Sequence, residues 1–144
     1  MDSNNRKKNI AMEYVIKRYL PENGYVDIRD VSTRKKGKEE NGYDVVAVNK
    51  EGQKVKIEVK GSQKDYGIPD CFGTEFEDQN RIKADFFYIV RINEEYNPYR
   101  LDIVSKSEFD RYSSLHKVKP VLKISSTLKK DLKDGKIGVK IPAT

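Results

Sequence analysis

Two acidic residues and one lysine on neighbouring predicted strands are the side chains best placed to do chemistry in this chain. Asp44 interrupts the apolar run 42–48, and Glu58 and Lys60 lie in the run 55–61. In the second run apolar residues alternate with charged ones, which is the period-two pattern of a half-buried strand. Two carboxylates can hold a divalent cation, and a lysine beside them can neutralise a phosphate. This combination of side chains points to hydrolysis of a phosphate ester.

The linker between the two runs determines how these residues face one another. It begins with Asn49 and ends with Gly52, a pattern typical of a type I turn closed by a left-handed glycine. A three-residue loop ending at Gly52 places Asp44 opposite Glu58. Opposed residues of an antiparallel pair share a face, with Cβ atoms about 4.5–5.5 Å apart, and Lys60 points to the same side. A one-residue shift in register would separate the two acids.

A purely structural interpretation of the same residues is also open. The chain is 36% charged, so an acid two positions before a lysine also arises by chance, as at Asp131 and Lys133. A strand with charged residues on its exposed face is ordinary in an antiparallel sheet that has one side in water. The paired Asp44 and the apolar setting of both strands favour the functional interpretation.

A helix is predicted to precede these strands, from about Arg6 to Leu20, and to end at Pro21. One side of it carries a broad apolar arc, formed by Ala11, Met12, Val15, Ile16, Tyr19 and Leu20. Glu13 lies at the edge of this arc. It is either a boundary residue that reaches for water or an acid directed into a site beside the core.

The remaining pattern predicts an α/β fold with a central mixed β-sheet flanked by helices. The nearly continuous apolar run 86–92 indicates a central strand, and further strands are expected over 100–104 and 118–124. Helices are expected over 74–84, from Ser105 to about residue 112 with Glu108 completing a capping box, and over 127–133 before Gly135. With 144 residues, we expect a single domain over 1–144, with a core of about 9–104 and a C-terminal extension of about 105–144.

Composition narrows the possible classes of protein. The chain has 29 Lys and Arg against 23 Asp and Glu, a net charge of +6, which suits a polyanionic partner such as nucleic acid. Its single cysteine, Cys71, cannot form an intrachain disulfide and fits a reducing cytoplasm. With no apparent signal peptide or membrane-spanning run, we expect a cytoplasmic protein without a membrane partner. His116 is the only histidine and lies far from Cys71 in the sequence, so no His/Cys set competes as a metal site and there is no sign of a Ser/His/Asp triad.

Positive charge gathers just before the Asp44 strand. The run comprises Arg34, Lys35, Lys36 and Lys38, and Lys64 follows soon after Lys60. These residues can hold the phosphates on either side of a scissile bond. The alternative interpretation is a solvated surface loop.

The order of these features resembles the PD-(D/E)xK nuclease superfamily of restriction-endonuclease-like folds. The resemblance lies in a helix with a glutamate, a strand with an aspartate, and a hydrophobic strand ending in Glu-x-Lys. The phrases Gly-Tyr-Asp-Val-Val at 42–46 and Ile-Glu-Val-Lys-Gly-Ser at 57–62 look like those of Mrr-type and related domains. The resemblance covers roughly residues 9 to 104 and implies a restriction-endonuclease-like core.

The resemblance also implies a role for each residue of the motif. Asp44 and Glu58 would bind Mg²⁺, with Mn²⁺ as a substitute, together with the backbone carbonyl of Val59. Lys60 would orient or activate the attacking water, and Glu13 would assist the metal site. The chain departs from the pattern at Tyr43, which takes the place of the motif's proline.

We therefore expect a metal-dependent DNA endonuclease of restriction or repair type, acting on double-stranded DNA. Because one chain carries one such site, cutting both strands favours a homodimer. Two alternatives remain. One is a catalytically inactive nuclease-fold module that binds DNA or a protein partner, and the other is a Holliday-junction-type resolvase.

Overall fold

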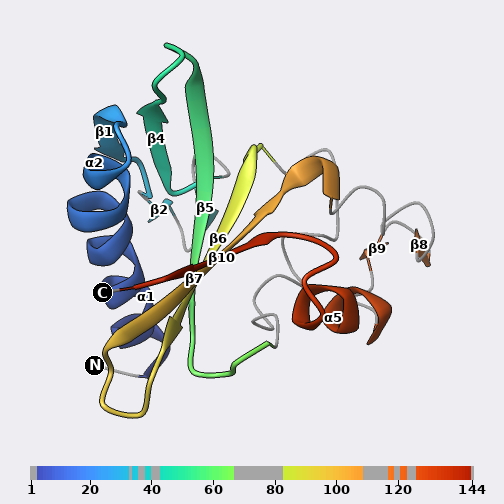
Figure 1. The fold of residues 1–144 in the computed structure, drawn as a ribbon. Helices are drawn as coiled ribbons and strands as arrows, with labels where there is room; N and C mark the ends of the chain where they lie inside the picture. Colours follow the sequence, from blue (N-terminus) through green and yellow to red (C-terminus); the bar gives the residue numbers. More distant parts are fainter. Residues whose placement is uncertain are drawn as a thin grey trace.

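The computed structural model describes residues 3–32, 34–35, 38–39, 43–66, 83–108, 117–118, 121–122 and 126–143. Within this part of the chain a six-stranded sheet has α1 on one side and α5 on the other (Figure 1). In spatial order the strands are β1 (Val26–Asp30), β4 (Val45–Val48), β5 (Lys54–Ser62), β6 (Phe86–Ile92), β7 (Pro98–Ser105) and β10 (Val139–Pro142). Strands β5 and β6 are parallel and the other neighbours are antiparallel. The predicted α/β class with a mixed sheet flanked by helices is confirmed.

The N-terminal helix is longer than predicted and changes its winding part-way. It comprises α1 (Ser3–Tyr14), a π-helical turn η1 (Val15–Tyr19) and α2 (Leu20–Glu22). The Leu20 N–H donates to the Val15 carbonyl, a bond to the fifth residue back that marks the wider turn. The prediction that the helix ends at Pro21 is wrong, because this residue enters the first turn of α2, where its missing N–H is tolerated.

The apolar face of the sheet packs against α1 and η1. Alternate residues of each strand point to this face, and they form one core with the predicted apolar arc of the helix. Its buried members include Ala11, Met12, Val15, Leu20, Val45, Ala47, Val55, Ile57, Val59, Tyr88, Val90 and Leu101.

The register of the central strands places the predicted site residues on the opposite face. Lys60 of β5 pairs with Ile89 of β6, and Ile89 pairs with Asp102 of β7. Two residues further along β5, Ser62 pairs with Arg91. Directly paired residues share a face, so Glu58 and Lys60 lie on the side of the sheet away from the core that α1 covers.

The turn that carries the prediction is confirmed. The Asn49 N–H donates to the Gln53 carbonyl at 2.9 Å, and Gly52 has a φ of 78°. The Asn49 side-chain oxygen also accepts the N–H groups of Glu51 and Gln53. The resulting register ends with Val45 opposite Ile57, and Asp44, which precedes Val45, donates its N–H to the Ile57 carbonyl.

Several other elements differ from expectation. Instead of one strand over 118–124, β8 (Lys117–Val118) pairs with β9 (Val121–Leu122), and β2 (Arg34–Lys35) pairs with β3 (Lys38–Glu39) in the predicted basic loop. Strands β1 and β10 were not predicted. Helix α5 (Ser126–Lys133), followed by Gly135 at a φ of 77°, is confirmed. The Ser105–Glu108 capping box is also confirmed, with the Glu108 N–H donating to Ser105 Oγ at 3.2 Å.

The helix expected over 74–84 falls almost wholly outside the described residues, as do Cys71 and His116. None of the helices that are described has the length and apolar character needed to cross a membrane.

Candidate functional site

The candidate site lies just before the first residue of β4, at a point where the neighbouring strand β5 continues. The Asp44 N–H donates to the Ile57 carbonyl at 2.9 Å, and the Asp44 carbonyl accepts the N–H of Val31. Strand β5 runs on to Ser62. Beyond this point β5 has no backbone partner in β4, and the Asp44 side chain takes that role: its Oδ2 accepts the Val59 N–H at 2.8 Å. A carboxylate is thereby fixed against the backbone of β5.

The structure brings the predicted acidic pair and lysine together. Asp44, Glu58 and Lys60 are 0%, 2% and 5% exposed. The Lys60 ammonium lies 3.3 Å from Glu58 Oε1. The Val59 carbonyl belongs to the same cluster, through the contact described next.

Lys8 of α1 is a member of this cluster that sequence reasoning missed. Its Nζ donates to Asp44 Oδ2 at 2.5 Å and to the Val59 carbonyl at 2.5 Å, and it lies 3.9 Å from Glu58 Oε1. The lysine precedes Met12 of the apolar arc by one helical turn, so it extends the side of α1 that faces the sheet. This spacing from Met12 was the feature of the sequence that could have placed Lys8 on the face of α1 toward the sheet.

Glu13 takes a different place from Lys8. It is exposed, and five positions along an α-helix amount to a rotation of about 140°. The structure does not bring Glu13 to the cluster, and it supports the interpretation of this residue as a boundary acid that reaches for water. Lys8 and Met12 lie on the face of α1 that meets the sheet, and Glu13 points away from that face.

The donor atoms of the cluster fit a hard divalent cation such as Mg²⁺. Two carboxylates and a backbone carbonyl supply oxygen ligands, and Mg²⁺ typically uses one or two carboxylates while it keeps several waters. Among the residues that the structure describes, no three His, Cys, Asp or Glu side chains gather as a metal-binding group. An ion at this site would therefore depend on water or substrate oxygens for the rest of its coordination.

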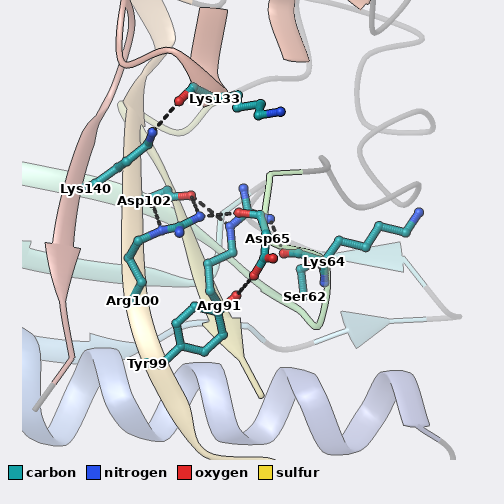
Figure 2. Close-up of polar contacts among 9 residues, drawn as sticks. All are labelled: Ser62, Lys64, Asp65, Arg91, Tyr99, Arg100, Asp102, Lys133 and Lys140. Atoms are coloured by element: carbon teal, nitrogen blue, oxygen red, sulfur yellow. Dashed lines mark hydrogen bonds and ion pairs between the residues drawn. The ribbon is translucent and has the colours of Figure 1, made fainter. Parts of the chain in front are cut away.

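A second polar cluster lies on the same face of the sheet, one strand further on (Figure 2). Arg91 and Asp102 are fully buried, and the Arg91 Nε lies 2.8 Å from Asp102 Oδ2. Arg100 contacts the other oxygen of Asp102, also at 2.8 Å. Burial lowers the pKa of Arg91, and its contact with Asp102 opposes this shift.

This second cluster anchors the segment that follows Lys60 and Ser62. Arg91 Nη1 donates to the Lys64 carbonyl at 3.1 Å. Arg100 donates to the Asp65 carbonyl, and the Tyr99 hydroxyl donates to the Asp65 carboxylate. The chain leaving the candidate site is therefore held by the buried Arg91 and by more exposed contacts of Tyr99 and Arg100.

The predicted nucleic-acid-binding residues are placed only in part. Lys64 is exposed, its N–H donates to Ser62 Oγ at 3.1 Å, and its side chain extends away from the second cluster in Figure 2. Arg34, Lys35 and Lys38 contribute backbone to β2 and β3. Their side chains and the whole of Lys36 lie outside the described residues.

Comparison with known proteins assigns the chain to a family. No curated protein and no solved structure shows significant similarity to it. A family model described as "Protein NO VEIN, C-terminal" matches residues 7–104. This match covers most of the chain, including most of α1, the strands β4, β5 and β6, and nearly all of β7. The chain therefore belongs to the family of the C-terminal region of Protein NO VEIN.

Proposed function

We propose that this protein is a metal-dependent DNA endonuclease with a site of the PD-(D/E)xK type. The observation that carries the proposal is the convergence of Asp44, Glu58, Lys60 and the Val59 carbonyl beside the first residue of β4. All three side chains are buried, and the Asp44 carboxylate is fixed by the Val59 N–H. Removing charged side chains from water costs folding free energy, and such groups are concentrated at functional sites, for example where an ion binds.

Each residue has a role in phosphodiester hydrolysis under this proposal. Asp44, Glu58 and the Val59 carbonyl would hold Mg²⁺ or Mn²⁺, which when bound polarises the phosphoryl group and assists formation of hydroxide. Lys60 would orient the attacking water and offset the charge that develops on the phosphate. Glu58, 3.3 Å from the Lys60 ammonium, would hold that ammonium in place.

The proposed substrate is double-stranded DNA, bound by a homodimer. The net charge of +6 favours a polyanion, and exposed Lys64 follows the site by four residues. Because each chain would cut one strand, cleavage of a duplex requires two sites, and a two-fold dimer supplies them.

Cleavage of supercoiled plasmid in Mg²⁺ or Mn²⁺ tests this proposal. We expect Asp44→Asn, Glu58→Gln and Lys60→Met to lower the cleavage rate by at least about 100-fold, with folding and DNA affinity retained. Lys54→Met is the matched control, because Lys54 is exposed at the other end of β5. Equal cleavage by Lys60→Met and Lys54→Met would remove Lys60 from the chemistry. Preferential cutting of four-way junctions over linear duplex would instead indicate a resolvase.

A catalytically inactive module that binds DNA or a protein partner is a second candidate, and one observation favours it. The ammonium groups of Lys8 and Lys60 already balance the two carboxylates, so the cluster has no net charge that calls for an ion. DNA binding without cleavage in any divalent metal, by a preparation with native folding, would support this candidate over the endonuclease.

A further inference from the structure

We propose that the Lys8 ammonium is a built-in cation of the candidate site, and that a divalent metal binds there only by displacing it. This inference rests on the proposed metal-binding function of Asp44, Glu58 and Val59. It assigns to Lys8, which that function does not include, control over metal affinity.

Lys8 contacts two of the three oxygen donors of the proposed metal site and lies near the third. Its Nζ lies 2.5 Å from Asp44 Oδ2, 2.5 Å from the Val59 carbonyl oxygen and 3.9 Å from Glu58 Oε1. These three oxygens come from the residue just before β4 and two adjacent residues of β5. One ammonium thus binds two of the oxygen donors of the site and lies within ion-pair distance of the third.

Packing of α1 against β5 holds Lys8 in this position. Gly61 lies directly under α1, and a Cβ at this glycine would come within 2.8 Å of the Lys7 carbonyl carbon. The missing side chain lets the backbone of α1 approach β5 closely. Lys8, the next residue, can therefore reach past the start of β4 to the Val59 carbonyl.

Lys8 and a metal ion cannot share the site. Both require the same lone pairs of Asp44 and Val59, and two cations at bonding distance from one carboxylate oxygen repel each other strongly in a buried setting. The Lys8 side chain can move into solvent, because it is 26% exposed while that of Asp44 is fully buried. The displaced ammonium would move to solvent, or to a phosphate of bound DNA, while the carboxylates stay in place.

The consequence is that Lys8 lowers the affinity of the site for metal in the absence of substrate. The cluster remains neutral without an ion, since two lysines face two carboxylates. A bound DNA phosphate would give the displaced ammonium a new partner and thereby favour metal entry. Lys8 is in this sense a regulatory residue and not a ligand.

Binding of Mn²⁺, followed by isothermal titration calorimetry without DNA, tests the inference. We expect Lys8→Met, which removes the ammonium but keeps an unbranched side chain of similar helix propensity, to raise the Mn²⁺ affinity at least tenfold. Lys17→Met is the matched control, because Lys17 is an exposed lysine of the same helical segment, and it should leave the affinity unchanged. Asp44→Asn combined with Lys8→Met should abolish the gain, which locates the binding at this site.

A second readout applies if Lys8→Met is only marginally stable. Saturating Mn²⁺ should raise the unfolding temperature of Lys8→Met more than that of the wild type, because the ion replaces a lost internal cation. Equal or weaker Mn²⁺ binding by Lys8→Met overturns the inference. Where that binding still depends on Asp44 and plasmid is still cut, the endonuclease proposal stands. Absence of Mn²⁺ binding in every variant overturns both.

Discussion

Arg91 is fully buried, and its guanidinium lies 2.8 Å from a carboxylate oxygen of Asp102, which is also fully buried. Asp102 accepts from Arg100 as well, at 2.8 Å. Two guanidinium groups thus share one carboxylate inside the fold. Removing one partner of a buried ion pair is costly because the other is left in a medium that does not solvate it.

At the residue scale we expect Arg91→Met to lower the free energy of unfolding by about 3 kcal/mol, near the lower end for a broken buried pair because Arg100 still contacts Asp102. The variant also loses the bond to the Lys64 carbonyl. Urea denaturation measures the change. Arg29→Met makes the same substitution at an exposed position of β1 and should alter stability by less than about 0.5 kcal/mol. Equal stability of the two variants would contradict the assignment of Arg91 as an anchor.

The residues that could be found from sequence are those related by local geometry. The turn from Asn49 to Gly52 and the register that it fixes, from Val48 opposite Lys54 to Val45 opposite Ile57, were predicted correctly because they follow from local geometry. The contact of Lys8 with Val59 spans 51 positions, and no local rule connects two residues so far apart. A side chain that joins a site through helix packing becomes visible only when the helix has been placed on the sheet.

At the element scale, Gly61 determines how closely α1 approaches β5. A Cβ at this position would meet the Lys7 backbone and would also come within 3.2 Å of the Ile92 side chain. Backbone cannot move aside as the end of a flexible side chain can. The helix would therefore have to shift as a unit.

We expect Gly61→Ala to destabilise the protein by about 1–3 kcal/mol, as overpacking of a filled interior does, and to weaken hydrogen-exchange protection in α1. Gly135→Ala is the control. It has open space around its Cβ but a φ of 77°, so its cost comes from local backbone strain. That variant should leave α1 protected. If α1 exchanges equally in both variants, the close approach does not depend on Gly61.

Strands with several buried residues could be predicted from the sequence, and strands with mostly exposed residues could not. Strands β5, β6 and β7 have several buried residues each, and their apolar patterns were readable in the sequence. Edge strands β1 and β10 have mostly exposed residues, so the pattern that marks a buried face is missing from them. The π-helical turn before Pro21 was also unpredictable, because the proline by itself signals a helix end.

At the scale of the whole molecule, the C-terminal segment completes the sheet. Strand β10 pairs with β7, from Val139 opposite Ile103 to Pro142 opposite Arg100, and Ile141 packs against the core. One strand of the segment 105–144 is therefore part of the main sheet. Strand β10 also covers a backbone edge of β7 that would otherwise be open to pairing with another chain.

Tyrosines that are wholly or partly shielded from water by folding link the stability of the molecule to pH. Burial raises the pKa of four of them, Tyr14, Tyr19, Tyr88 and Tyr99. The shift of Tyr88 is large, and its interaction with Tyr25 adds to the effect of burial. The folded protein therefore holds these phenolic protons at a pH where the unfolded chain, with a tyrosine pKa of about 10, releases them.

We expect the free energy of unfolding to decrease as the pH rises above about 10. Below that pH both states carry the phenolic protons, so this contribution to stability is fully present. Above it the unfolded state binds fewer protons than the folded state, and stability is lost by up to about 1.4 kcal/mol per pH unit for each tyrosine that remains protonated in the fold. Urea denaturation at a series of pH values from 8 to 11 (roughly the range that brackets a free tyrosine) measures the slope.

Tyr88→Phe removes one such proton while it keeps the ring that packs edge-on against Tyr19, so its profile should be less steep than that of the wild type. Parallel profiles for the two proteins would show that Tyr88 does not contribute to the alkaline loss of stability.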